Sequence, residues 1–570
     1  MLVAGCNTAR SRRGCWPCRG KRVKCDEQKP SCGRCCAGTG VCDYTPRPSL
    51  AVRRRQGQRQ VSLSCPSNPR TFSSPSSGEM AACSLHLGPR DHEAIRFFRT
   101  SFAQLHHTKN PAFSLFAVMF DLAREDAMVM HMVLSLGMCA MDARRCRRDS
   151  SLTGSDHRQV SLHHYSAALR LMSDAVSRPD GSPPNMDVTL TALWLMCLYE
   201  QLFGDTGSQG FATHLRGAAR LLQQQQSHIK LLRSAADNQG ADPIEPTALI
   251  RQSPGASHDR LSLYSARALL WLSLHDSAAA TCGVGGHLTM TLYQTLSREM
   301  QDEGGGTIAT TATGMTSPVD IFHHLYRYSN PLYRTVWGEA YPQAELLDDV
   351  ENRAVFGCLV HASQLRFLVA QLAAAFRVPP GRRGGTAEAA ICQAAQVEAE
   401  IERLGRESAE LIDVAAGLSA STDNSHQLVA NIRTIVPLYH AVVLDFVRLL
   451  DLHAESLRQD QPQDRRRRQA LREQALREIM KLAHQVHKHG GDELTTKVAW
   501  PLFLVALGTD DELHRDWILA RFAAFGQYGD NFVRAAKFLN MILAMQDRLG
   551  HKRVDYRELM RTEDVFILGI

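Results

Sequence analysis

The sequence lacks the short motifs that mark common enzyme active sites. It contains no phosphate-binding Gly-x₄-Gly-Lys loop, no His-Glu-x₂-His pair and no Gly-x-Ser-x-Gly elbow. The Gly-rich stretch 282–286 follows no predicted strand, so it is a weak candidate for a nucleotide site. A role in helix packing, and not in catalysis, is the preferred interpretation for His163, His164, His214 and the pair 199–200. We therefore expect a protein that is not an enzyme.

Features that would direct the chain into or across a membrane are also scarce. The most apolar stretch, 435–450, is interrupted by His440, Asp445 and Arg448, which favours a buried helix over a bilayer span. Residues 1–6 end in a cysteine, as a lipoprotein cleavage box does, but no basic start and no long apolar stretch precede it. We expect no membrane partner and no secretion. In the reducing compartment that this implies, clustered cysteines favour metal binding or catalysis over disulfides.

Acidic residues and histidine are rare in the first 60 positions. This segment holds 14 Lys and Arg, 3 Asp and Glu, and no His, a net charge of +11. The whole chain of 570 residues carries +7, so the remaining 510 residues carry −4. A length of 570 residues with 44% hydrophobic content predicts more than one domain and a sizeable buried core. A basic head on a slightly acidic body indicates that the head contacts a polyanion.

The cysteines are concentrated in the same basic head. Eight of the 16 lie in the first 42 residues, and six of these repeat one set of intervals. Each half has the form Cys-x₂-Cys-x₆-Cys, with six residues between the halves. A random scatter of cysteines would not repeat its own intervals. The repeat consists of Cys15, Cys18, Cys25, Cys32, Cys35 and Cys42.

The number of thiolates constrains the metal chemistry. Two tetrahedral zinc ions need eight ligand positions, and six cysteines fill them only if two bridge both metals. The segment is too short to bury a useful core, so the two zinc ions must supply its folding energy. A set of disulfides is disfavoured in the reducing compartment expected for this protein. A redox Cys-x₂-Cys site would need a βαβ setting, which the sequence does not show. Cys6 and Cys36 could complete two four-cysteine sites, but neither fits the repeat, and we interpret both as spare thiols.

The sequence around these cysteines resembles the fungal Zn₂Cys₆ binuclear cluster family. The segments that carry the resemblance are CWPCRGKRVKCD at 15–26 and KPSCGRC at 29–35, and every interval fits over 15–42. The resemblance implies that Cys15 and Cys32 bridge the two zinc ions and that Pro30 sets the turn between the halves. It also implies a helix that enters the major groove of double-stranded DNA.

The basic run between Cys18 and Cys25 is the candidate DNA-reading surface. By the resemblance, Lys21 and Arg22 contact base edges, and Arg19 and Lys24 contact phosphates. Arg and Lys only donate hydrogen bonds, and guanine presents two acceptors in the major groove, so such a helix suits G-rich DNA. The family's preference for CGG half-sites agrees with this. Phosphate contact or solvation is the alternative for each basic side chain.

Residues 43–90 have the composition of a disordered linker rich in Ser, Pro and Arg. Basic tracts at 10–13, 21–24 and 53–55 could serve nuclear import, so we expect a nuclear protein, although the tracts could simply attract DNA. The linker shows no heptad repeat of the kind that pairs many family members. The protein is therefore expected to bind DNA as a monomer, or as a homodimer that pairs through the larger region.

Residues 91–570 show helical periodicity and predict a large all-α domain. Apolar residues recur at a 3-4 spacing in 91–106 and 127–141. Breaks rich in Gly, Pro and Ser are expected near 179–185, 233–258, 303–318 and 378–385. Further helices are expected near 160–178, 187–203, 211–230, 259–281, 352–376, 386–412, 425–453, 465–489 and 511–548. Five cysteines are interpreted as small core residues, namely Cys139, Cys197, Cys282, Cys358 and Cys392.

Four short segments of this region resemble the fungal-specific transcription factor regulatory domain: HYSAAL at 164–169, LWLMCLYE at 193–200, HLRGA at 214–218 and WPLF at 500–503. The resemblance implies a sequence-specific regulator of RNA polymerase II transcription that contacts the transcription machinery and could sense a small-molecule effector. Its target would be a secondary-metabolite gene cluster, with a nutrient pathway as the alternative. A zinc-anchored interaction scaffold and a zinc-anchored enzyme are the alternatives from other classes.

Overall fold

A computed structural model describes the chain at 15, 18, 25–29, 31–36, 44, 85–106, 109–148, 155–178, 183–224, 261–302, 317–377, 387–422, 427–454, 461–549, 554–561, 563 and 565–569. The chain divides into two compact units, Met1–Ser77 and Gly78–Ile570. In the described part of the first unit, α2 (Gly33–Cys36) is the longest helix. The described part of the second unit consists of helices and loops, with no strand, which confirms the predicted all-α domain.

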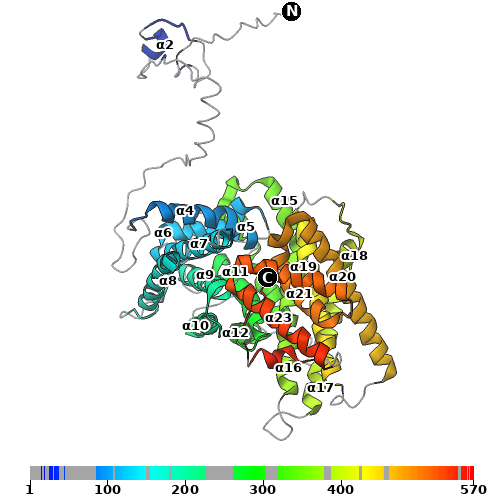
Figure 1. Ribbon diagram of the computed structural model, residues 1–570. Coiled ribbons are helices and arrows are strands. Elements are labelled where there is room, and N and C mark those ends of the chain that lie inside the picture. Colours follow the sequence, from blue (N-terminus) through cyan, green and yellow to red (C-terminus); the bar gives the residue numbers. More distant parts are fainter. Residues whose placement is uncertain are drawn as a thin grey trace, which may run out of the picture. The chain divides into compact units, whose positions relative to one another are not determined.

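The N-terminal helices of the large domain group on one side of it, in blue and cyan in Figure 1. The π-helix at Phe98–Phe102 interrupts the predicted helix 91–106. The elements are α4 (Pro89–Phe97), the π-helix, α5 (Ala103–His106), a 3-10 turn (Pro111–Phe113), α6 (Leu115–Glu125), α7 (Ala127–Arg148), α8 (Ser155–Val176), α9 (Met186–Phe203) and α10 (Gln209–Gln224).

The middle of the chain supplies the central helices α11 and α16. These elements are α11 (Leu263–Ala280), α12 (His287–Asp302), α13 (Pro318–Ser329), α14 (Leu332–Trp337), a 3-10 turn (Gly338–Ala340), α15 (Gln343–Glu351), α16 (Arg353–Phe376), α17 (Ala387–Glu407) and α18 (Ala409–Gly417). Helix α16 packs against α11, α13 and α17. It is long and apolar enough to cross a membrane, but 72% of its apolar window is buried inside the domain, as in a core helix.

The C-terminal helices lie on the side opposite α4–α8, in orange and red in Figure 1. They are α19 (Gln427–Leu452), α20 (Pro462–Thr495), a 3-10 turn (Thr496–Val498), α21 (Ala499–Gly508), α22 (Glu512–Phe525), a second turn (Gly526–Tyr528), α23 (Asp530–Arg548) and α24 (Tyr556–Leu559). Helix α19 packs against α16, α20 and α21. Side-chain caps fix several helix starts; for example, Asp511 accepts the backbone N–H of Leu513 at 2.9 Å.

The segment at 565–569 is not helical, and its central residues lie in the domain interior. Phe566, Ile567 and Leu568 are buried. The side-chain amide of Asn531 pairs with the backbone of Ile567 in both directions, each hydrogen bond being 2.8 Å long. Arg366 Nη1 donates to the Leu568 carbonyl at 2.9 Å. These side chains satisfy backbone groups that a helix would satisfy internally.

Some sequence predictions need correction. The single helix predicted at 511–548 is two helices, because the chain turns at Gly529 with φ +156°, where a Cβ would lie 2.8 Å from the Leu202 carbonyl oxygen. Cys392 is exposed, because α17 buries the stripe of Ala390, Ala394, Val397, Ile401 and Leu404, and Cys392 lies off that stripe. The other four cysteines predicted as core residues are buried.

Much of the predicted linker at 43–90 lies outside the described residues, as do most of the predicted breaks at 233–258, 303–318 and 378–385. Helix α4 already begins at Pro89, within the predicted linker. No helix was predicted at α6, α13, α14, α15 or α21, whereas the Gly-rich stretch 282–286 was expected to open a helix, and α12 begins directly after it. Helix α21 is buried on all sides, so its sequence carries no helical period.

Candidate metal centre and nucleic-acid interface

Four cysteines of the first unit bring their sulfur atoms together. The Sγ atoms of Cys15, Cys18, Cys32 and Cys35 all lie within 4.8 Å of one another, and all four residues are buried. Cys15 Sγ lies 3.7 Å from both Cys32 Sγ and Cys35 Sγ, and Cys18 Sγ lies 3.6 Å from Cys32 Sγ. A zinc–thiolate tetrahedron with bonds of about 2.3 Å has sulfur–sulfur edges of about 3.8 Å. The sulfur spacing therefore fits tetrahedral zinc.

Cys25 joins this cluster from the end of the first half of the repeat. Its Sγ lies 3.8 Å from Cys15 Sγ. Cys15 thus contacts sulfur atoms of both halves, and Cys32 contacts both cysteines of the first Cys-x₂-Cys pair. Cys42, the sixth predicted ligand, lies outside the described residues.

Backbone N–H groups point at the sulfur atoms. The N–H of Cys35 donates to Cys32 Sγ at 3.4 Å, and the N–H of Glu27 donates to Cys25 Sγ at the same distance. The Tyr44 hydroxyl lies 3.6 Å from Cys25 Sγ. Burial alone would raise the pKa of the Cys25 thiol, but the hydrogen bonds from Cys15, Tyr44 and Glu27 outweigh it and lower the pKa to about 6. The surroundings of Cys25 therefore favour the thiolate that a metal needs.

Asp26 connects the two halves of the repeat. Its Oδ2 accepts the backbone N–H of Gly33 at 2.7 Å, so the residue after Cys25 is bonded to the residue after Cys32. A Cβ at position 33 would lie 2.8 Å from that carboxylate oxygen, so a larger residue would displace the Asp26 side chain from this hydrogen bond. The sequence alone indicates no role for Asp26, because an acidic residue beside a cysteine has no distinctive spacing.

The predicted DNA-contacting residues Arg19, Lys21, Arg22 and Lys24 lie outside the described residues, as does Pro30. Their roles stay predictions. Cys36 is exposed, and no metal-ligand group among the described residues includes it.

Three of the regulatory-domain segments converge on one polar cluster in the large domain. The hydroxyl of Tyr165 on α8 hydrogen-bonds to Glu200 Oε1 on α9 and lies 2.7 Å from His214 Nε2 on α10. Burial lowers the pKa of His214 to about 4, so at neutral pH its imidazole is uncharged. Tyr199 stacks on Tyr165 with ring centroids 4.4 Å apart. The cluster connects three helices, and its contacts are those of helix–helix packing.

The fourth segment, at 500–503 in α21, supports the buried C-terminal segment. The Arg366 guanidinium lies 3.8 Å from the Trp500 ring centroid and also binds the Leu568 carbonyl. Phe503 packs against Phe566 at a centroid distance of 5.6 Å.

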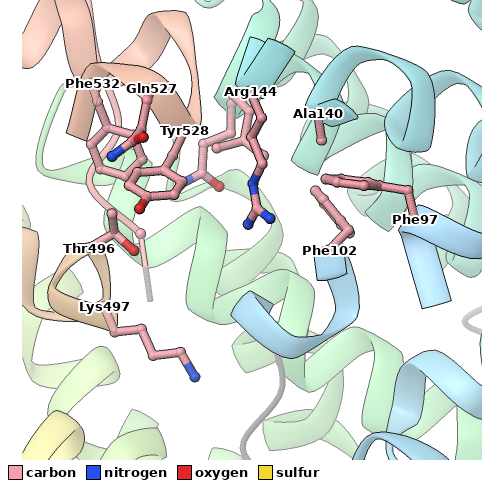
Figure 2. A pocket seen from close by; sticks show the side chains of 12 residues that line it. Phe97, Phe102, Ala140, Arg144, Thr496, Lys497, Gln527, Tyr528 and Phe532 are labelled. Carbon is pink, nitrogen blue, oxygen red and sulfur yellow. The ribbon is translucent and has the colours of Figure 1, made fainter. Parts of the chain in front are cut away.

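A cavity of about 60 Å³ lies between the N-terminal and C-terminal helices of the large domain. Figure 2 shows Arg144 between Tyr528 on one side and Phe97 and Phe102 on the other, with Lys497 further away beside Thr496. Arg144 pairs with Glu493 at 2.6 Å. Burial lowers the pKa of Lys497 to about 8.

A cysteine cluster with tetrahedral spacing and a separate all-helical domain define a zinc-cluster protein with a large helical region. The family described as "Fungal specific transcription factor domain" matches residues 94–568, and "Fungal Zn(2)-Cys(6) binuclear cluster domain" matches residues 13–50. The chain therefore belongs to the fungal zinc-cluster transcription factors, and its N-terminal module is one that binds two zinc ions. Both resemblances seen in the sequence are confirmed, and both families are transcription factor domains.

Curated relatives match over short segments. The chain is 45% identical over 49 residues to "Transcription factor lfc1" of Flammulina velutipes, covering 8% of this chain and 17% of the relative. It is 51% identical over 43 residues to "Pestheic acid cluster transcriptional regulator 3" of Pestalotiopsis fici, covering 7% and 8%. It is 58% identical over 51 residues to "Aspercryptin biosynthesis cluster-specific transcription regulator atnN" of Emericella nidulans, covering 9% and 8%. Each match thus spans less than a fifth of the relative. No solved structure matches the chain.

Proposed function

We propose that this protein is a nuclear, sequence-specific DNA-binding regulator of RNA polymerase II transcription. The observation that carries the proposal is the central position of Cys15 and Cys32 in the sulfur cluster. In this assignment both thiolates bridge the two zinc ions, and the terminal ligands are Cys18, Cys25, Cys35 and Cys42. The metals supply folding energy to a segment too short to have a core, and so they hold the basic run in place.

The DNA-reading residues follow from that assignment. Lys21 and Arg22 contact base edges in the major groove, and Arg19 and Lys24 contact phosphates. The donor-only chemistry of Lys and Arg matches the two acceptors of guanine, so the target contains CGG-like elements. The excess of positive charge in the first 60 residues adds affinity that falls as salt rises.

The regulated genes form a secondary-metabolite biosynthetic cluster in this proposal. Two of the three relatives above carry names of cluster regulators. Regulation of a nutrient pathway is the competing assignment. The helical domain contacts the transcription machinery and responds to an effector. The protein binds DNA as a monomer, or as a homodimer that pairs through the helical domain.

The direct test measures binding of the zinc-loaded full-length protein to a CGG-containing duplex and to a scrambled duplex. The double substitution Lys21→Ala, Arg22→Ala should abolish the preference for the CGG duplex. The matched control Arg12→Ala, Arg13→Ala removes the same charge outside the cysteine repeat, and it should weaken binding to both duplexes while keeping the preference. Equal preference in both double variants would contradict the assignment of Lys21 and Arg22 as the base-contacting residues. The absence of any preference in the wild-type protein would favour a protein-interaction scaffold over a DNA reader.

A further inference from the structure

A second cavity, of about 50 Å³, lies in the large domain between α11, α13, α14 and α16. Its walls are mostly apolar and include Trp271 of α11 and Phe356 of α16. Three cationic side chains also line it, Lys109, Arg267 and Arg353, against the single carboxylate of Asp349. A mostly apolar cavity with converging cations is unusual, and the partners of each cation show which of them are free to bind a ligand.

Arg267 is a buried cation without an anionic partner. It is 7% exposed, and no carboxylate among the described residues pairs with it. Its Nη2 donates to the Ser329 carbonyl at 3.0 Å and to Asn330 Oδ1 at 3.1 Å, both of which are neutral. Its Nε–H is buried and has no acceptor. Burying a guanidinium is costly unless an anion and a full set of hydrogen bonds compensate it. Arg267 therefore lacks both an anion and one acceptor.

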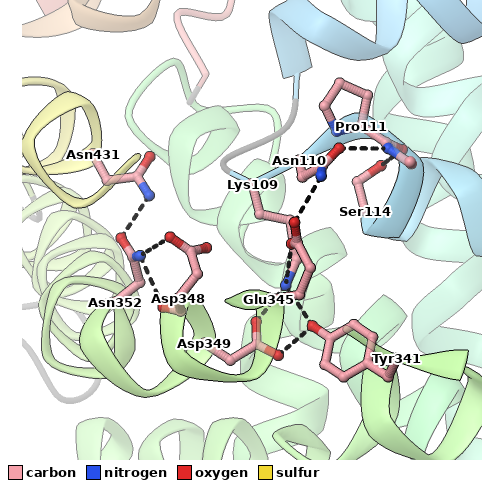
Figure 3. A network of polar contacts seen from close by, with 11 residues as sticks. Lys109, Asn110, Pro111, Ser114, Tyr341, Glu345, Asp348, Asp349, Asn352 and Asn431 are labelled. Carbon is pink, nitrogen blue, oxygen red and sulfur yellow. Dashed lines mark hydrogen bonds and ion pairs between the residues drawn. The ribbon is translucent and has the colours of Figure 1, made fainter. Parts of the chain in front are cut away.

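Lys109, in contrast, is already neutralised. Its Nζ lies 2.5 Å from Asp349 Oδ1 and 2.7 Å from the Tyr341 hydroxyl, with Glu345 Oε2 at 3.6 Å (Figure 3). This network holds α15 in place and uses the cavity's only carboxylate. Arg353, the first residue of α16, is exposed and forms no ion pair with the described residues. Two guanidinium groups therefore remain available, one at depth and one at the surface.

The size and lining of the cavity restrict the ligand. One water needs about 10–15 Å³ of such space, so about 50 Å³ holds a carboxylate and a few carbon atoms but no aromatic ring. The apolar walls disfavour a fully hydrated inorganic anion, because its lost hydration would not be replaced. A carboxylate can accept two parallel hydrogen bonds from a guanidinium.

We propose that this cavity binds a small aliphatic carboxylate, with the carboxylate paired to Arg267 and Arg353 and the alkyl chain against Trp271 and Phe356. Such a ligand connects α11 to the start of α16, the central helix of the domain. Its meaning as an effector rests on the transcriptional function proposed above, whereas binding itself does not.

The test titrates the zinc-loaded full-length protein with butyrate and follows tryptophan fluorescence, since Trp271 lines the cavity, together with the thermal unfolding midpoint. Acetate and hexanoate bracket the chain length. Neutral butyramide and sodium sulfate are the controls. We expect a saturable fluorescence change and a raised midpoint with a carboxylate of this series and neither response with butyramide or sulfate. The absence of a saturable response across the series, or an equal response to butyramide, would overturn the proposal.

Three variants locate the site. Arg267→Gln removes the buried charge but keeps hydrogen-bonding groups, and Arg353→Gln does the same at the exposed position in case the first variant fails to fold. Each should weaken carboxylate binding at least about tenfold. Arg334→Gln, exposed on α14 and outside the cavity lining, is the matched control and should leave binding unchanged. Unchanged binding in Arg353→Gln and in a folded Arg267→Gln would overturn the proposal. DNA binding is measured on the same preparations, so that the two proposals can be tested separately. If DNA binding is absent while carboxylate binding is intact, only the transcriptional function is contradicted.

Discussion

The Sγ atoms of Cys15 and Cys32 lie 3.7 Å apart, although the two residues begin different halves of the cysteine repeat. Each of these sulfur atoms also contacts a cysteine from elsewhere in the repeat. A thiolate in such a position can be shared by two metals, whereas a thiolate at the edge of the cluster serves one. This difference between central and peripheral cysteines gives the zinc assignment its measurable consequences.

Substituting a central cysteine should cost more zinc than substituting a peripheral one. In the proposed assignment, Cys32→Ser removes a ligand from both zinc sites, whereas Cys18→Ser removes a ligand from one. Zinc per chain, measured by mass spectrometry on purified full-length protein, should therefore be lower for Cys32→Ser than for Cys18→Ser. The exposed Cys36 provides a control, since Cys36→Ser should keep two zinc ions per chain. Zinc loss from Cys36→Ser, or equal zinc content in the other two variants, would contradict the assignment.

The buried C-terminal segment should contribute strongly to the stability of the large domain. Asn531→Ala leaves the N–H of Ile567 buried without its partner, while the Ile567 carbonyl keeps only the Gln201 side-chain amide at 3.2 Å. The substitution should therefore lower the free energy of unfolding by about 1–3 kcal/mol. Asn540→Ala on the same helix removes an exposed hydrogen bond and should change the free energy of unfolding by about 0.5 kcal/mol or less. Urea unfolding followed by circular dichroism compares the two. Similar midpoints would show that the segment contributes little.

Acid should destabilise the large domain through its buried neutral histidines. Burial lowers the pKa values of His275 and His440 from 6.5 to about 4, so the folded state binds fewer protons than the unfolded state between these values. The stabilisation is fully present above pH 6.5 and is lost as the pH falls towards 4, at about 1.4 kcal/mol per pH unit for each histidine. Urea unfolding of wild type and His440→Asn over this range tests the slope. A slope that His440→Asn leaves unchanged would argue against the contribution of His440.

The sequence predicted the metal module well because zinc coordination depends on short, repeated intervals. It predicted the all-α character of the large domain because most of its helices bury one stripe. It could not predict the break at Gly529, which follows from the approach of the distant Leu202 carbonyl. The pairing of Asn531 with Ile567 and the unpaired position of Arg267 likewise depend on residues far apart in sequence. Asp26 is local to the module, but its bond to Gly33 becomes visible only in three dimensions.

The most direct test of the central claim is selection of bound sequences from a random double-stranded DNA pool by the zinc-loaded full-length protein. We predict enrichment of a CGG-like element, because the proposal assigns Lys21 and Arg22 as donors to guanine edges. One copy of the element would indicate a monomer, and a pair at fixed spacing would indicate a homodimer. Absence of any enriched sequence, in protein verified to hold two zinc ions per chain, would contradict the assignment of this protein as a DNA reader.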